Sequence, residues 1–176
     1  MVYNHLITEE EKEIMSYRSK TTDVILCGIF AALIAICSWI SIPAVVPFTL
    51  QTFAVFLTVG LLGTKRGLIT VLVYLLLGAI GAPVFAGFGS GMGIILGPTG
   101  GYLIGFLATA LITGIIISRF GSKVHILAIA MVAGLIACYA FGTAWFMYVY
   151  GQQSGPVGLG AALSGCLIPF IIPDGA

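Results

Sequence analysis

Few residues of this 176-residue chain could carry catalytic chemistry. Its two histidines are His5, near the charged N-terminus, and His125, beside a short basic segment. Neither lies near the uncharged segments that could form a site, so a serine hydrolase would lack its base. The absence of a Gly-Lys dipeptide excludes a P-loop. The uncharged segments contain no carboxylate pair to hold a metal, and the four cysteines are scattered without a C-x-x-C pair. These observations argue against an enzyme.

The polar groups that remain suit recognition of a small, mostly uncharged ligand. Gln51 lies in an apolar segment, where an amide is costly to bury unless it is hydrogen-bonded, and it offers donors and an acceptor. Asp174 is the only acidic residue after Asp23, and acids in membrane segments are usually functional. Asp174 could instead cap a helix, and hydroxyls in apolar helices often bond their own backbone. Further polar candidates are Thr49, Thr52, Tyr74, Ser90, Thr99, Tyr102, Tyr139, Thr143 and Trp145.

The elements that position these groups are membrane spans. The chain is 60% hydrophobic and 7% charged, with a mean hydropathy of +1.16, which indicates an all-α integral membrane protein. Between Asp23 and Asp174 the charged residues are all basic: Lys65, Arg66, Arg119 and Lys123. These four basic residues are too few to form a positively charged surface for nucleic acid. Nucleic-acid binding is therefore not expected.

A charged leader precedes five predicted spans. Residues 1–23 are expected to be a cytoplasmic leader with a short amphipathic helix, because Thr8 and Glu11 form a capping-box pattern. The leader is too charged for a cleaved signal peptide. Residues 24–176 are expected to form one transmembrane substrate-binding domain, with a hydrophobic loop or half-helix at 157–172 and a sixth span that only begins at Pro173. The five predicted complete spans are 24–42, 50–63, 68–80, 99–118 and 124–148.

Uncharged segments rich in glycine and proline separate several of these spans. Ten of the 24 glycines lie between Gly78 and Gly105. Irregular backbone survives in a bilayer only where protein or water satisfies it, so 82–98 is predicted to be a folded-in loop and a place for a binding site. A solvent-exposed loop is the alternative. All seven basic residues fall in the leader, at 64–67 or at 119–123, which predicts a cytoplasmic N-terminus and uncharged loops outside.

Several motifs in order resemble the BioY family. They are PFTLQTFAVFL, the KRG turn, VYLLLGAIGAPVFAGF, LGPTGGYLIGF, FGTAWF and LIPFIIPD, within residues 22–174. Members are the substrate-binding (S) components of energy-coupling-factor (ECF) transporters that import biotin. The resemblance implies a six-helix S-component fold in a bacterial cell membrane and an outward-facing biotin pocket. It also implies no cofactor, and partnership with a membrane coupling (T) component and two ATPase subunits. Members carry a lysine three residues after the aspartate of PFIIPD, a position beyond Ala176.

The resemblance also assigns candidate roles. Gln51 and Asp174 are expected to meet polar groups of biotin, while small residues of the first span, Ala31 and Ala35, are expected to contact the T component. For the alanines, ordinary packing within the chain is the alternative. For the whole protein, the alternative is a stand-alone carrier or channel that acts as an oligomer. The remaining expected binding residues are the hydroxyl of Thr49, the walls Phe48, Tyr74 and Phe85, and Gly89, Gly91 and Gly93, where the backbone could approach the ligand closely.

Overall fold

A computed structural model describes residues 9–42 and 47–154 of the chain, with side chains for residues 20–41, 47 and 49–152. The predicted half-helix and the start of a sixth span lie outside these residues. By length and composition alone, four helices in the described part could cross a bilayer, in agreement with the predicted membrane class. The elements in chain order are α1 (Glu9–Trp39), β1 (Ser41–Ile42), β2 (Phe48–Thr49), α2 (Gln51–Ala79), the 3₁₀ turn η2 (Ala86–Phe88), α3 (Met92–Leu96), α4 (Gly100–Phe120) and α5 (Val124–Ser154).

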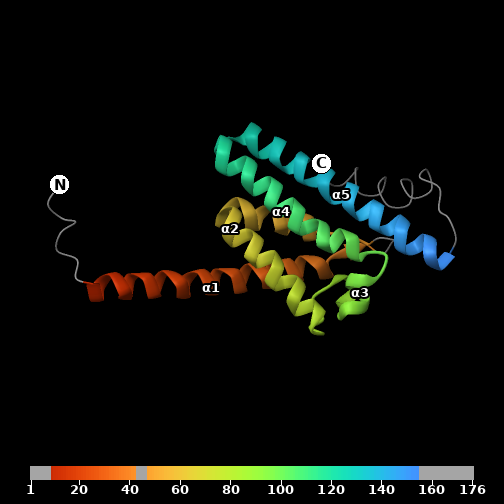
Figure 1. The fold of residues 1–176 in the computed structure, drawn as a ribbon, viewed down its shortest axis with the longest axis horizontal. Helices are drawn as coiled ribbons and strands as arrows, with labels where there is room; N and C mark the ends of the chain where they lie inside the picture. Colours follow the sequence, from red (N-terminus) through yellow and green to blue (C-terminus); the bar gives the residue numbers. More distant parts are fainter. Residues whose placement is uncertain (1–8, 43–46, 155–176) are drawn as a thin grey trace.

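Helix α1 runs without a break through the boundary at which a separate leader helix was expected. Residues 9–27 contain neither Gly nor Pro, so nothing in the sequence ends the helix there. Its 31 residues extend for about 46 Å, which exceeds the ~30 Å hydrocarbon core of a bilayer. Figure 1 accordingly shows the N-terminal part of α1 extending beyond the other helices.

The first span ends three residues earlier than the predicted 42. Pro43 disfavours helical backbone at the residue before it. Ser41 and Ile42 instead pair with Thr49 and Phe48 in a short antiparallel ribbon. The ribbon flanks the uncharged segment that separates the first two predicted spans. It places Thr49 and the start of α2 beside the end of α1.

Helix α2 folds back on itself at Gly63. This residue has φ +78° and ψ 174°, a backbone conformation that is essentially restricted to glycine. Gln51 Nε2 donates to the Tyr74 hydroxyl at 2.8 Å, although 23 residues of straight helix would separate them by about 35 Å. The limbs 51–62 and 64–79 are therefore two short segments joined by a sharp turn (Figure 1). They correspond to the predicted short spans, with the turn at Gly63 in place of 64–67.

The described basic residues of the spans gather at one end of the molecule. Figure 1 shows the α2 turn and the α4–α5 turn at this end, and residues 47–50 and 80–99 at the opposite end. Arg66 Nη2 lies 2.8 Å from Asp23 Oδ1, which ties the α2 turn to α1. Both side chains are partly exposed, so the pair contributes about 0–1 kcal/mol. Its main effect is to fix how the two helices meet.

Helices α4 and α5 approach closely where glycine replaces a side chain. A Cβ atom added to Gly101 would lie 2.3 Å from Trp145, and one added to Gly142 would lie 2.3 Å from the Tyr102 ring. Small residues are the usual means of close helix contact in membranes, where apolar burial alone drives little association. Helix α5 continues to Ser154, beyond the predicted end at 148.

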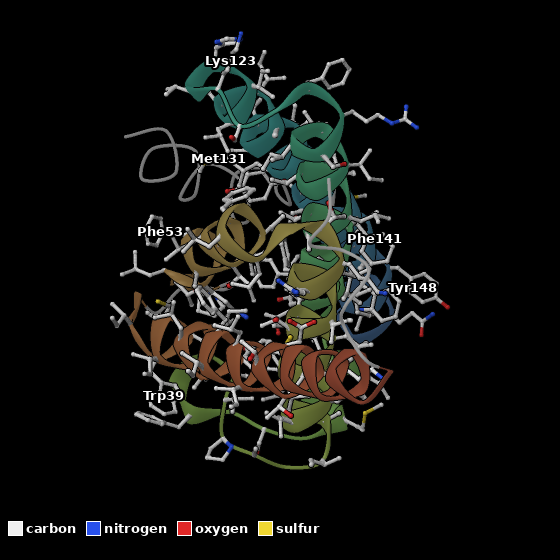
Figure 2. All side chains as sticks on the ribbon, turned by 90° about the vertical axis from the view of Figure 1, so that its left-hand side faces the viewer. Trp39, Phe53, Lys123, Met131, Phe141 and Tyr148 are labelled. Carbon is white, nitrogen blue, oxygen red and sulfur yellow. The ribbon has the colours of Figure 1, made fainter. Side chains whose placement is uncertain are left out.

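The apolar core lies between α1, α2, α4, α5 and the 80–91 segment, and the outer surface is also apolar. Ile34, Val55 and Val71 are fully buried in this core. On the outside, Phe53 and Tyr148 are 58% and 66% exposed, and Figure 2 shows both pointing outward. An apolar exterior around a packed interior is what a bilayer-embedded protein requires.

Candidate functional site

A cavity of about 210 Å³ lies at the end of the molecule where residues 47–50 and 80–99 lie. Among its described lining residues none is charged, and most of the surface is aromatic or aliphatic, which is typical of small-molecule sites. The lining comprises Pro47, Thr49, Gln51, Thr52, Phe85, Ala86, Ile94, Thr99, Tyr102, Leu103, Phe106, Cys138 and Tyr139.

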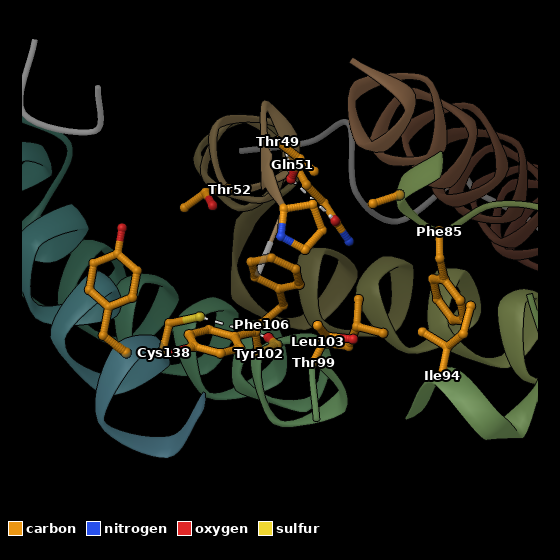
Figure 3. A pocket seen from close by; sticks show the side chains of 13 residues that line it. Thr49, Gln51, Thr52, Phe85, Ile94, Thr99, Tyr102, Leu103, Phe106 and Cys138 are labelled. Carbon is orange, nitrogen blue, oxygen red and sulfur yellow. Dashed lines mark hydrogen bonds between the residues drawn. The ribbon is translucent and has the colours of Figure 1, made fainter. Parts of the chain in front are cut away.

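Polar and aromatic groups occupy different sides of this cavity. Figure 3 shows Thr49 of β2 and Gln51, the first residue of α2, on one side, with Tyr102 and Phe106 of α4 across from them. Phe85 lies to the other side, next to Ile94 of α3. Residues from α2, α3, α4, α5 and the η2 segment thus surround one space within a single chain.

Three of the predicted binding residues line the cavity: Thr49, Gln51 and Phe85. Phe48 contributes backbone to β2, but its side chain lies outside the described residues, and so does the whole of Asp174. The roles assigned to those two residues stay predictions.

Tyr74 does not belong to the described lining. It is fully buried behind Gln51, whose Nε2 donates to its hydroxyl at 2.8 Å. The Tyr74 hydroxyl in turn donates to the backbone oxygen of Val84 at 3.0 Å. Ser38 Oγ, on α1, reaches the same oxygen at 2.6 Å. Tyr74 therefore links α2 to α1 and to the 80–91 segment, and contacts the cavity only through Gln51 and Phe85.

Phe85 is held against α2 by a close approach at Gly78. A Cβ atom on Gly78 would lie 2.0 Å from Cζ of the Phe85 ring, so only glycine leaves room for it. The ring is 1% exposed and meets Tyr74 edge-on, with centroids 5.7 Å apart. Gly91 N–H donates to Gly78 O at 2.7 Å, which closes the segment over the ring. Phe85 is thus a rigidly placed wall.

The three glycines expected to approach the ligand lie beside the cavity without lining it. Gly89 faces Ile94 Cδ1, which a Cβ atom would approach to 2.5 Å. Gly91 has φ +91°, a backbone conformation that favours glycine, so the turn at this position accounts for the residue. Gly93 has open space around it. In the described structure, packing and turn geometry account for Gly89 and Gly91, and contact of the three with a ligand stays a prediction.

Helices α4 and α5 supply lining residues that no sequence argument had placed in the site. Phe106, Leu103 and Cys138 resemble the other apolar residues of their helices, so hydropathy did not distinguish them. Tyr102 was noted only as a polar candidate; its hydroxyl lies 3.2 Å from Thr143 Oγ1, and Cys138 Sγ donates to its backbone oxygen at 3.8 Å. The spacing of Tyr102 and Phe106, one helical turn apart, was the available signal.

Ala31 and Ala35, the expected contacts of a partner protein, are 2% and 5% exposed and belong to the core of this chain. On the same helix Gly28 and Ala32 are exposed, and Gly28 has nothing within 4 Å of an added Cβ atom. The two small-residue pairs of α1 therefore differ: one packs inward and the other faces outward.

In the described part of the chain no group of three or more His, Cys, Asp or Glu side chains could hold a metal ion. Buried side-chain nitrogen and oxygen atoms there all have a hydrogen-bond partner. The arrangement suits binding through hydrogen bonds and apolar contact.

Comparison with known proteins places this arrangement in a family. The model of the BioY family matches residues 10–176. The chain belongs to the BioY family. A biotin transporter BioY of Thermotoga maritima is 50% identical over 120 residues, which cover 68% of this chain and 70% of the relative. A probable biotin transporter BioY of Pyrococcus horikoshii is 40% identical over 156 residues, 88% of each chain.

The fold also agrees with that of a solved structure. The crystal structure of the S component for biotin from an ECF-type ABC transporter matches with a TM-score of 0.77 at 30% identity. The match covers 89% of this chain and 85% of that chain. The predicted family and S-component fold are thereby confirmed.

Proposed function

We propose that this chain is the S component of an ECF vitamin importer and that it captures biotin in the cavity beneath the 80–99 segment. It is a transport subunit and not an enzyme. The observation that carries the proposal is a cavity formed within one chain, whose described lining is uncharged and combines aromatic walls with amide and hydroxyl groups. Membership of the BioY family supports the same function.

The chemistry of biotin fits this lining. Its ureido ring needs acceptors for two N–H groups and donors for one carbonyl, which Gln51 and Thr49 supply in part. Its sulfur-containing ring and its four-methylene tail suit the aromatic and aliphatic walls. Burial of the tail contributes roughly 3 kcal/mol at ~0.8 kcal/mol per methylene. Asp174 is proposed as a further acceptor for the ring nitrogens.

We further propose that the chain works with a T component and two ATPase subunits in a bacterial cytoplasmic membrane. The absence of a P-loop from the sequence is consistent with ATP hydrolysis in partner subunits.

The N-terminus is proposed to be cytoplasmic, because the α2 turn and the α4–α5 turn carry the basic residues at one end. The cavity then opens toward the outer side. Small residues of α1 are proposed to meet the T component.

Isothermal titration of the purified chain with biotin tests the proposal. The expected result is saturable binding without ATP or any partner, because one chain forms the described cavity. Riboflavin and thiamine serve as competitors, and neither should displace biotin. Binding that requires the assembled complex, or equal competition by either vitamin, would contradict the proposal.

A further inference from the structure

The hydrogen bonds around Tyr74 can run in only one direction. The backbone oxygen of Val84 accepts and cannot donate, and the Tyr74 hydroxyl lies 3.0 Å from it. A phenol has one proton, so once it donates to Val84 its oxygen is left as an acceptor. Gln51, 2.8 Å away on the other side, must then present its amide nitrogen to Tyr74. The reverse orientation would leave the oxygens of Tyr74 and Val84 facing each other without a proton between them.

Burial makes this direction hard to reverse. Ser38 and Tyr74 are fully buried and Gln51 is 3% exposed, so water does not compete for these groups. Ser38 Oγ lies 2.6 Å from Val84 O and 2.7 Å from Ala35 O, both of which only accept. The single Ser38 proton can serve only one of these two oxygens at a time, and the contact holds α1 against the Val84 carbonyl. An unsatisfied donor or acceptor in such a place costs its full desolvation.

With its nitrogen committed to Tyr74, Gln51 directs its amide oxygen to the side of Thr49. Among the described residues, the only partner of Oε1 is the Thr49 hydroxyl, at a long 3.5 Å. The Gln51 backbone N–H donates to Thr49 Oγ1 at 3.3 Å, which holds the two side chains together. Both residues line the cavity. The amide oxygen thus has spare acceptor capacity next to the ligand space.

We propose that Tyr74 is a positioning residue: it fixes the Gln51 amide with its oxygen available to the cavity, so that the site selects a ligand that presents an N–H donor there. The inference rests on the proposed function, in which that donor is a ureido N–H of biotin. The same Tyr74 ring also meets Phe85 edge-on, next to Val84. One residue therefore sets the polar acceptor and supports an aromatic wall.

The test compares two ligands on two proteins. The ligands are biotin and an analogue with both ureido nitrogens methylated, and the proteins are the full wild-type chain and Tyr74→Phe. The variant keeps the ring that packs on Phe85 and removes only the hydroxyl. The ratio of the two dissociation constants is the readout, because the bulk of the methyl groups affects both proteins alike. We expect the preference for biotin to shrink about tenfold in Tyr74→Phe, since the freed amide can rotate.

Controls separate this role from a structural one. Tyr148→Phe removes a hydroxyl from a side chain that is 66% exposed and should leave the ratio unchanged. Equal loss of affinity for both ligands in Tyr74→Phe, with an unchanged ratio, would overturn the proposal. Gln51→Ala, which leaves Tyr74 bonded to Val84, should shrink the preference by a similar factor, and an undiminished preference there overturns the proposal even if Tyr74→Phe does not fold. Failure of the wild-type chain to bind biotin would instead refute the proposed function.

Discussion

At the scale of single residues, the cavity wall formed by Phe85 depends on a glycine, Gly78, that leaves room for its ring. Phe85 is placed by its sequence in a loop, yet it is among the most buried aromatic rings of the described chain. Gly78 makes this possible, since any Cβ atom there would overlap the ring. The hydrogen bond from Gly91 N–H to Gly78 O, 2.7 Å long, holds the segment in place. The glycine-rich composition of 78–105 therefore reflects close packing as well as turns.

Gly78→Ala should destabilise the protein and weaken biotin binding. The added methyl group must displace Phe85, and overpacking of this kind costs about 1–3 kcal/mol. The midpoint of thermal unfolding and the dissociation constant for biotin measure the two effects. For stability, Gly93→Ala is the matched control, because nothing lies within 4 Å of its added Cβ atom. Equal stability of the two variants would show that Phe85 does not need the space at Gly78.

At the scale of elements, the sharp turn in α2 is what brings Gln51 to Tyr74. The turn is made at Gly63, whose positive φ has no counterpart at the other glycines of α2. Behind it, Gly67 lies so close to Val59 that a Cβ atom would approach Val59 Cγ2 to 2.9 Å. The two limbs are thus packed tightly from the turn onward, and the cavity forms where they end.

Two glycines of α2 should respond to alanine with opposite signs. Gly63→Ala forces a side chain into a backbone region that costs about 1–3 kcal/mol. Gly60→Ala adds a methyl group with nothing within 4 Å in a helix interior, where alanine is favoured by about 1 kcal/mol. Thermal unfolding of both variants in the same detergent checks this. A Gly63→Ala protein at least as stable as wild type would contradict the described turn.

Sequence predicted these elements well wherever hydropathy, charge or proline marks a boundary. The short spans around Lys65 and Arg66 and the folded-in loop before Thr99 correspond to limbs and loops of the structure. The continuity of α1 was missed, because a charged stretch and an apolar stretch can share one helix. The contribution of Phe106 and Cys138 to the site was missed as well. In a protein apolar inside and outside, periodicity does not tell a cavity-facing residue from a lipid-facing one.

At the scale of the whole molecule, the cavity and the small residues of α1 proposed to meet a partner lie in different parts of the structure. The cavity lies among α2, α4 and α5, whereas the exposed small residues Gly28 and Ala32 lie on α1. Ala31 and Ala35 are buried against the rest of the chain, so contact through them would require α1 to separate from α2. Gly28 and Ala32 need no such rearrangement.

Tryptophan at neighbouring alanines separates these two possibilities. Ala32→Trp should prevent co-purification with the T component and leave biotin affinity unchanged, because the side chain faces outward. Ala31→Trp should lower the thermal unfolding midpoint, since position 31 is 2% exposed. Normal co-purification of Ala32→Trp would exclude this face of α1 as the contact.

The claim that biotin occupies the cavity within this chain is tested most directly at two adjacent positions of α2. Thr52 lines the cavity, whereas Phe53 is 58% exposed on the outside. An indole at position 52 would fill much of a space of about 210 Å³. The dissociation constant for biotin should therefore rise about 100-fold or more in Thr52→Trp, equivalent to about 2.8 kcal/mol, and stay within about twofold in Phe53→Trp. A folded Thr52→Trp protein that binds biotin as tightly as wild type would place the ligand elsewhere and contradict the account.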